Sequence, residues 1–488
     1  MVTGAGRRTS RPLARRGRRD PVPGGDMTTD RYDVAVVGAG IVGAAIARLL
    51  GGTSLSVALL EARDDVGDGT SKANTAILHT GFDATPGTLE ARLVARGYAL
   101  LGDYAAATGI PVERTGALLV AWTDEQLRTL PALRAKAERN GYTACELVDA
   151  AAVYDAVPAL GPGALGGLTV PGESITCTWT TNLALATDAV NRGVTLLRGH
   201  RVTAADAGPD ATRLDTTGGA VTARWVINAA GLHADALDRL FGYERFTVTP
   251  RRGELYVFDK LARPLVPCIV LPVPSKAGKG VLVSPTIYGN VMLGPTAEDL
   301  PDRTATGTSA RGLAYLLERG RELMPRLLDE EVTATYAGLR AGIGRDDYLV
   351  DVDVDAGRRY VLVGGIRSTG LTAGMAIAEH VAGLLDGALD LTPRPDLPDP
   401  PRMPNLGEAG VRPFRDPAAI DADPEYGHIV CFCERVTRGE IRDAYRSPVP
   451  PADLDGLRRR TRAMNGRCQG FYCGAEVGEL LRTRGGAR

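Results

Sequence analysis

Four of the seven cysteines lie close together near the C-terminal end of the chain. Cys431 and Cys433 stand in VCFCERVTRGEI, and Cys468 and Cys473 stand in GRCQGFYCG, which gives the spacing C-x-C-x34-C-x4-C. Thiolates grouped in this way hold structural zinc or a [2Fe-2S] cluster, and a close pair of thiols can instead form a redox disulfide. The tight C-x-C pair is less typical of zinc, but on the residues alone all three kinds of site stay open.

A second chemical motif lies near the start of the chain, in RYDVAVVGAGIVGAAIARLL. Its pattern predicts a buried strand over 34–37, a glycine turn and an amphipathic helix, and LSVALLEA predicts a second strand that ends at Glu61. Glycines at G-x-G-x-x-G spacing permit a tight turn and the approach of a pyrophosphate, and an acid on the next strand accepts from ribose hydroxyls. The motif predicts a dinucleotide bound by Gly38, Gly40, Ile41, Val42, Gly43, Glu61 and Ala62.

Later segments favour FAD over NAD. The long loop RDDVGDGTSKANTAILHTGFD follows the second strand, where a simple nicotinamide dehydrogenase would continue with regular strands and helices. RWVINAAGLHADAL and YVLVGGIRSTGLTAGMAIAEHVAGLL are two more strand-to-helix turns, and three such turns suit one long ligand. Gly365 and Gly370 lack the spacing of a separate NAD site. The further predicted FAD contacts are Thr70, Ser71, Ala73, Asn74, His79, Val202, Ala229, Ala230, Gly231, Gly338, Arg340, Gly370, Leu371 and Thr372.

These segments, with TSKANTAILHTGFDATPGTLEARL and TPRRGELYVF, resemble the D-amino-acid-oxidase-type flavoproteins over residues 31–390. Within that family they are similar to the glycerol-3-phosphate and L-2-hydroxyglutarate dehydrogenases. The resemblance implies a mixed α/β and α+β fold, in which a Rossmann-like FAD-binding domain is interleaved with a mainly antiparallel substrate domain from about 85–185 and 240–345. Short runs such as RTGALLVAW, GELYVF, KGVLVS and GNVMLG agree with strands there.

The catalytic side chains are predicted from the chemistry of flavin dehydrogenation, in which a base takes a proton as hydride leaves the substrate. His79, in AILHTG, matches a histidine of the resembled dehydrogenases and is our candidate base; the alternative is a structural histidine beside the cofactor. Arg252 in PRRGE, Arg340 in YAGLRAG and Arg367 in GIRSTG are the candidates for binding a substrate anion, and each could instead be a surface ion pair. Lys72 is expected to support the FAD phosphates or the loop.

The C-terminal segments resemble the bacterioferritin-associated-ferredoxin-type [2Fe-2S] module, and more closely the C-terminal module of the anaerobic type of glycerol-3-phosphate dehydrogenase. All four thiol positions and the C-Q-G-x-x-C string match, although AMNG departs from the usual glycine-rich turn. The resemblance implies that Cys431, Cys433, Cys468 and Cys473 are cluster ligands. Nearby cations that could stabilise an anionic cluster, or form a solvated helix face, are Arg458, Arg459, Arg460, Arg462 and Arg467.

Composition bounds the remaining expectations. A net charge of -1 over 488 residues argues against general nucleic-acid binding. Scattered Cys145, Cys177 and Cys268 suit a reducing cytoplasm, and no membrane span is visible in the sequence, although peripheral attachment stays open. We expect a basic disordered tail over 1–30, with Met27 as the natural start, an oxidoreductase domain over 31–392, a proline-rich linker over 393–424 and a [2Fe-2S] domain over 425–488.

The sequence thus predicts an FAD-dependent dehydrogenase that oxidises a small anionic alcohol, with glycerol 3-phosphate as the first choice. It would pass electrons through a [2Fe-2S] cluster to an acceptor protein or a quinone-linked subunit, within a homo- or hetero-oligomer. The first alternative is a dehydrogenase of hydroxy acids of the L-2-hydroxyglutarate type, or of amines and amino acids of the opine type. The second is a non-catalytic electron-transfer subunit.

Overall fold

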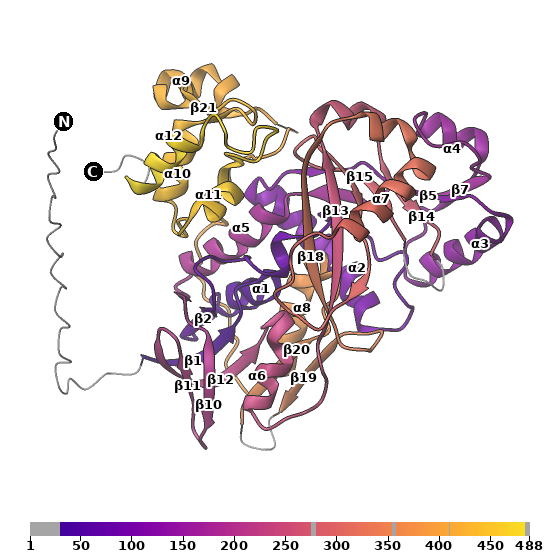
Figure 1. Ribbon diagram of the computed structural model, residues 1–488. Helices are drawn as coiled ribbons and strands as arrows, with labels where there is room; N and C mark the ends of the chain where they lie inside the picture. Colours follow the sequence, from indigo (N-terminus) through magenta and orange to yellow (C-terminus); the bar gives the residue numbers. More distant parts are fainter. Residues whose placement is uncertain (1–29, 275–279, 354–357, 409, 484–488) are drawn as a thin grey trace, which may run out of the picture.

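The computed structural model describes residues 30–274, 280–353, 358–408 and 410–483, and the tail predicted over 1–30 lies outside this part apart from Asp30 (Figure 1). Its first sheet has eight strands, in the order β10-β11-β12-β1-β2-β9 with β20 beside β12 and β19 beside β20. The parallel core of this sheet is β1 (Asp30–Val37), β2 (Val57–Glu61), β9 (Thr195–Arg198), β12 (Gly219–Asn228) and β20 (Tyr360–Gly364). Antiparallel strands at its margins are β10 (Val202–Ala207), β11 (Thr212–Thr216) and β19 (Leu349–Asp353).

Both faces of this sheet are covered, as expected for a buried parallel sheet. One face packs against a layer of four helices, α1 (Ile41–Leu50), α2 (Leu89–Thr108), α5 (Thr178–Asn191) and α8 (Gly370–Leu385). The other face packs against α6 (Ala234–Leu240). Helices α2 and α5 come from the range 85–185 but pack against α8 and α1 of the nucleotide side. The domain bounds proposed from the sequence stay predictions.

The second sheet has nine mostly antiparallel strands, in the order β17-β13-β16-β15-β14-β5-β7-β6 with β18 beside β13. Its longest pair joins β13 (Thr249–Phe258) to β18 (Val332–Gly342), and β14 runs parallel to β5. Helices α3 (Asp124–Arg139), α4 (Ala150–Ala156) and α7 (Ala310–Leu323) pack on it. The other strands are β5 (Ala117–Ala121), β6 (Glu146–Asp149), β7 (Gly166–Val170), β14 (Ile269–Pro272), β15 (Leu282–Pro285), β16 (Val291–Gly294) and β17 (Glu298–Asp299).

A small third sheet and the 3-10 helix η1 (Thr70–Lys72) lie in the segments that join these two layers. The third sheet places β8 (Ser174–Thr176) between β3 (Ile77–Leu78) and β4 (Val112–Glu113). The described part of the chain therefore has the mixed architecture that the sequence predicted. The candidate base, His79, directly follows β3 of this third sheet.

The C-terminal module sits beside α5, at one end of the molecule (Figure 1). It contains the hairpin β21 (Ile429–Cys431) and β22 (Val436–Thr437), and the helices α10 (Arg438–Arg446), α11 (Leu454–Thr461) and α12 (Gly474–Arg482) around their own apolar cluster. Helix α10 begins with a reciprocal capping box between Thr437 and Glu440.

The proline-rich segment before this module is packed along the first domain. Pro393 bridges to Thr53, and the Met403 amide donates to the Thr108 carbonyl. The segment predicted as a linker also contains a short helix, α9 (Pro417–Ala422). Asp416 caps that helix by accepting from the amides of the second and third helical residues, and proline at the first position costs no hydrogen bond there.

Candidate active site and thiol cluster

The glycine turn between β1 and α1 is built for close backbone contact. Gly38 has φ +109°, and a Cβ there would lie 2.5 Å from the Ala229 carbonyl oxygen, so the first and second glycine turns touch. A Cβ at Gly43 would lie 1.8 Å from the Gly38 carbonyl oxygen. The Ile41 amide at the start of α1 donates to the Ser71 hydroxyl over 2.9 Å. Helix α1 thus points its N-terminus at the loop after β2, as a pyrophosphate site requires.

A cavity of about 1670 Å³ runs from this turn to the second sheet. That volume exceeds the usual 300–1000 Å³ of small-ligand pockets and can take a dinucleotide together with a substrate. Gly43, Thr372 and Arg252 do not line it. The predicted residues that do are Gly38, Gly40, Ile41, Val42, Glu61, Ala62, Thr70, Ser71, Ala73, Asn74, His79, Val202, Ala229, Ala230, Gly231, Gly338, Arg340, Arg367, Gly370 and Leu371.

Glu61 ends β2 at the edge of this cavity. Its carboxylate accepts from the Ala39 amide over 2.9 Å and from the Arg63 amide over 3.0 Å, so it fixes the glycine turn. Burial raises the pKa of Glu61, against the lowering by these two hydrogen bonds. Lone pairs of its two oxygens remain for ribose hydroxyls.

The loop after β2 is pinned against the second sheet. The Thr70 hydroxyl donates to the Leu339 carbonyl over 2.9 Å, and a Cβ at Gly338 would lie 2.1 Å from the Ala73 carbonyl oxygen. Lys72 does not line the cavity but donates to Asp68 over 2.6 Å, so it supports the loop. Strand β18 and η1 are therefore packed together and form one part of the cavity wall.

His79 lies in the cavity wall with its imidazole oriented by Glu173, a residue that sequence reasoning missed. His79 Nδ1 is 2.9 Å from Glu173 Oε2, and the Thr80 amide and hydroxyl both donate to Glu173 Oε1. Glu173 is fully buried in the turn before β8. Because a carboxylate can only accept, Nδ1 carries the hydrogen and Nε2 presents a lone pair.

Thr372 contacts the His79 backbone and does not line the cavity. Its hydroxyl accepts from the His79 amide over 3.0 Å, which ties β3 to the start of α8. Thr372 and Gly43 were predicted as cofactor contacts; neither lines the cavity, and their cofactor role stays a prediction. They were assigned from the linear motif, which does not show which side of a turn faces the ligand.

Arg340 is the cation best placed for a substrate anion. It lies on β18 opposite Arg251, and a Cβ at Gly253 would be 2.8 Å from its guanidinium nitrogen. Burial, and then the charge of Arg251, lower the pKa of Arg340. In the described part of the chain no hydrogen bond or ion pair is made by the Arg340 side chain. A half-buried guanidinium without a partner favours a bound anion.

The two other candidate arginines have protein partners. Arg367 lines the cavity but donates to Glu90 over 2.5 Å and to the Asp346 carbonyl over 2.7 Å, so its charge is already matched. Arg252 donates to Glu298 over 2.5 Å and does not line the cavity. The prediction that Arg252 binds substrate is therefore not supported by its position.

The four C-terminal cysteines come together as two contacting pairs, Cys433 with Cys468 and Cys431 with Cys473. Backbone amides of Tyr472, and also of Gly470 and Phe471, donate to the Cys468 sulfur and lower its pKa. No group of three or more His, Cys, Asp or Glu side chains among the described residues has the arrangement of a ready single-ion site. Four thiols in two pairs fit a cluster whose two irons each take two thiolates.

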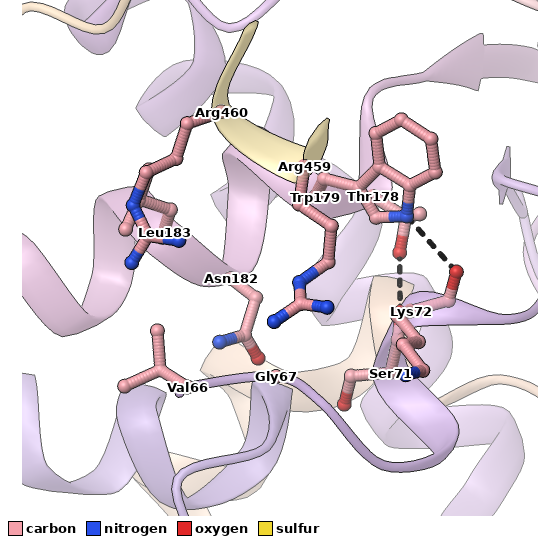
Figure 2. A pocket seen from close by; sticks show the side chains of 10 residues that line it. All are labelled: Val66, Gly67, Ser71, Lys72, Thr178, Trp179, Asn182, Leu183, Arg459 and Arg460. Atoms are coloured by element: carbon pink, nitrogen blue, oxygen red, sulfur yellow. Dashed lines mark hydrogen bonds between the residues drawn. The ribbon is translucent and has the colours of Figure 1, made fainter. Parts of the chain in front are cut away.

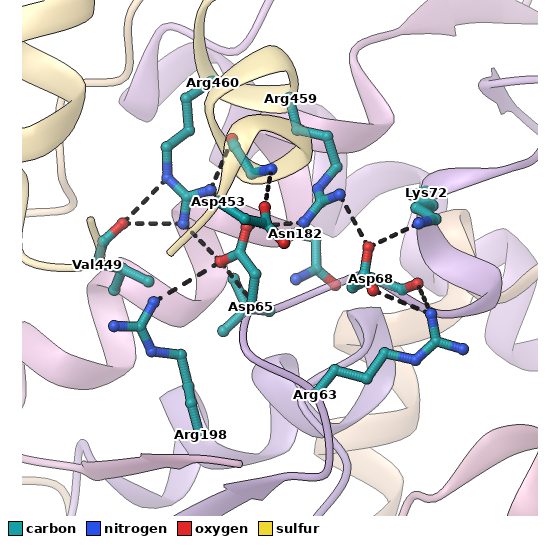
Figure 3. A network of polar contacts seen from close by, with 12 residues as sticks. Arg63, Asp65, Asp68, Lys72, Asn182, Arg198, Val449, Asp453, Arg459 and Arg460 are labelled. Carbon is teal, nitrogen blue, oxygen red and sulfur yellow. Dashed lines mark hydrogen bonds and ion pairs between the residues drawn. The ribbon is translucent and has the colours of Figure 1, made fainter. Parts of the chain in front are cut away.

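Three of the arginines near these cysteines in the sequence form ion pairs with carboxylates. Those of Arg459 and Arg460 reach the first domain (Figure 3), and that of Arg462 lies within the module. Arg459 and Arg460 both donate to Asp65, in the loop that follows β2, over 2.7 Å. Burial would raise the pKa of Asp65, but hydrogen bonds and charge from Arg460, and then from Arg459, lower it. Arg462 donates to Glu434 over 2.8 Å. Arg459 and Arg460 thus hold the module on the first domain, whereas Arg462 forms its ion pair inside the module.

Two family profiles match this chain. The FAD dependent oxidoreductase family matches residues 33–384, and the BFD-like [2Fe-2S] binding domain matches residues 429–483. Glycerol 3-phosphate dehydrogenase of Caloramator mitchellensis is 35% identical over 452 residues, which cover 92% of this chain and 94% of that protein. L-2-hydroxyglutarate dehydrogenase of Nematostella vectensis is 27% identical and covers 72% of this chain and 90% of its own.

A solved structure agrees with the two-layer architecture. L-α-glycerophosphate oxidase of Mycoplasma pneumoniae, with FAD bound, superimposes with a TM-score of 0.73 at 27% identity, covering 77% of this chain and all of that one. FAD and a [2Fe-2S] cluster are thus the cofactors of this chain, and their predicted sites are the cavity and the four thiols. Among the described residues no helix has both the length and the apolar character to cross a bilayer.

Proposed function

Because this chain belongs to the FAD dependent oxidoreductase family, we propose that it oxidises glycerol 3-phosphate and passes the electrons through its [2Fe-2S] cluster to a separate acceptor. The observation that supports this most is that the unpartnered Arg340 and a base already oriented by a carboxylate line the same cavity. The dehydrogenase of Caloramator mitchellensis, similar over nearly the whole chain, points to glycerol 3-phosphate among small anionic alcohols.

Arg340 would bind the phosphate and fix the substrate carbon beside the cofactor. A guanidinium binds phosphate oxygens in a fork, and its low hydration suits a buried site. Arg345 and Arg311 also line the cavity, but Arg311 is already paired with Glu298. Arg367 and Arg252, held by Glu90 and Glu298, would shape the wall instead of binding the anion.

His79 would take the proton of the secondary hydroxyl on Nε2. Glu173 holds the other ring nitrogen and stabilises the imidazolium that forms, while Thr80 fixes Glu173. When bound, FAD would accept the hydride from the carbon that bears this hydroxyl. General-base assistance of this kind contributes roughly 100- to 10,000-fold to a rate.

The acceptor would be a protein or a quinone-linked subunit, and the enzyme would work in the cytoplasm as part of a homo- or hetero-oligomer. A one-electron cluster on a domain of its own suits transfer out of the chain, because a flavin that reacted mainly with oxygen would have no use for it. The non-catalytic alternative has less support, since a pure relay would need neither His79 nor Arg340 in the cavity.

An anaerobic visible spectrum before and after addition of glycerol 3-phosphate tests the proposal. Bleaching of the flavin bands, followed by loss of cluster absorbance, is expected. His79→Ala should keep FAD but lose bleaching, whereas His380→Ala on α8, outside the cavity, should bleach normally. Bleaching by L-2-hydroxyglutarate or an amine and not by glycerol 3-phosphate would contradict the substrate and keep the enzyme class.

A further inference from the structure

A buried stack of three side chains joins the C-terminal module to the loop of the cofactor cavity. Arg462 lies at the left-handed C-cap of α11, and its guanidinium carbon is 4.0 Å from the Tyr288 ring centroid. The Tyr288 ring stacks on Trp179, with centroids 5.3 Å apart and planes at 26°. The Trp179 indole N–H donates to the Lys72 carbonyl over 3.0 Å, as Figure 2 shows.

One end of this stack reaches the thiol cluster. Arg462 Nε donates to Glu434 Oε2 over 2.8 Å, and Glu434 directly follows Cys433. A Cβ added at Gly466 would lie 2.3 Å from the Cys433 Cβ, so the chain that follows Arg462 is packed directly on this ligand. The guanidinium therefore lies within one hydrogen bond of the residue next to a cluster sulfur.

The other end reaches the wall of the cofactor cavity. Lys72 stands between Ser71 and Ala73, which both line the cavity. Trp179 itself does not line it, and neither does Tyr288. The Tyr288 hydroxyl is 3.0 Å from the Cys177 sulfur, which fixes the ring from behind. The stack thus ends on the backbone of the FAD-binding loop, outside the space for substrate.

Arg462 and Tyr288 are buried and Trp179 is partly buried, so little of the stack faces solvent. Arg462 is 4% exposed and Tyr288 is 8% exposed. A guanidinium over the face of an aromatic ring is attracted by the ring, and more strongly where water is excluded. Electron tunnelling is faster through packed and bonded atoms than across a solvent gap, so a dry, continuous contact is what such a transfer needs.

We propose that Trp179, Tyr288 and Arg462 form the path by which electrons leave the reduced flavin for the [2Fe-2S] cluster. The path rests on the proposed function, because it needs both cofactors loaded. Each transfer would take one electron from the two-electron-reduced flavin and reduce one iron from ferric to ferrous, and the only bond broken would be the flavin N–H bond that releases its proton. A one-electron acceptor outside the chain reoxidises the cluster before the second electron follows, and the flavin proton goes to solvent.

Flash photoreduction of the flavin in the holoenzyme, followed by stopped-flow recording of cluster absorbance, tests the path without any substrate. Trp179→Leu and Tyr288→Leu should slow cluster reduction about ten-fold or more, on the scale by which misplacement of reacting groups costs rate. Tyr288→Phe keeps the ring and should stay near the wild-type rate. Tyr256→Leu is the control, because it removes a half-buried tyrosine ring of the second sheet that is not part of the stack. Its rate of cluster reduction should also stay near that of the wild type.

Two outcomes separate the path from a structural role. The expected one is a slow rate in the two Leu variants with the electron paramagnetic resonance spectrum of the reduced cluster unchanged. Equal rates in all variants, or the same slowing by Tyr256→Leu, would overturn the path. A wild-type cluster that stays oxidised after flavin photoreduction would overturn the electron route itself, whereas failure of glycerol 3-phosphate to bleach the flavin concerns the substrate alone.

The contact is also measurable without cofactors. In the cofactor-free protein, Arg462→Met removes the guanidinium that seals the outer face of the stack, and acrylamide should then quench the Trp179 fluorescence more strongly. The background comes from Trp122 and Trp225, and Trp179→Phe identifies the share of Trp179. Unchanged quenching in Arg462→Met would overturn the assignment of Arg462 to the path.

Discussion

Replacing Asp65 by Asn should loosen the C-terminal module from the first domain. The Asp65 carboxylate accepts three hydrogen bonds of 2.7 Å from Arg459 and Arg460, and its side chain is 2% exposed. Removing one partner of a buried ion pair costs about 3–5 kcal/mol, because the other charge is left uncompensated. Arg459 keeps Asp68 and Arg460 keeps two carbonyl partners, so the lower end, about 3 kcal/mol, is expected.

Scanning calorimetry of the cofactor-free protein measures this loss. For a domain of 60–100 residues each kcal/mol lowers the melting temperature by about 4–8 °C, so the module should melt roughly 10–20 °C below its wild-type transition. Asp64→Asn is the matched control, since it removes the same charge from the neighbouring exposed residue. A single transition at the wild-type temperature in Asp65→Asn, or an equal shift in Asp64→Asn, would refute the reasoning.

Three further outcomes are expected. The pKa of Asp65 is lowered in the folded protein, so its ionised form stabilises docking at pH values above the unfolded pKa near 3.8. In a calorimetric pH series, the melting temperature of the module should be unchanged at pH 5 and should fall as the pH drops below about 4. Glu173→Gln should reduce kcat about 10- to 100-fold with KM unchanged in steady-state assays, because the Glu173 carboxylate orients His79 without touching the substrate. Arg340→Met should raise KM for glycerol 3-phosphate roughly 10- to 100-fold, the equivalent of a charge-assisted hydrogen bond of about 1.5–3 kcal/mol.

Local patterns in the sequence predicted the cofactor side of the molecule well. The strand, turn and helix around Gly38 follow from residue types within a dozen positions, and the structure brings this turn against Ala229 as the second motif implied. His79 and Arg340 were found because resembled proteins carry such residues at matching positions. Their roles stay predictions, although both line the cavity.

Long-range contacts were not readable from the sequence. Glu173 binds His79 across 94 positions, and Arg460 binds Asp65 across 395. Nothing in the local sequence of VPGESIT distinguishes Glu173 from a solvated acid in a turn, and RRRTR reads equally well as an exposed basic helix. Burial and pairing that depend on two distant segments appear only once the layers are assembled.

The aspartates that hold the module stand in the same loop that wraps the cofactor. Asp65 and Asp68 precede Thr70 and Ser71, which line the cavity, so ordering this loop serves two binding events. Thermodynamic linkage then makes the events mutual: FAD tightens docking of the module, and the docked module tightens FAD by the same factor. We therefore expect flavin-free chains to leave the module more open to proteolysis and its thiols more open to oxidation than flavin-loaded chains.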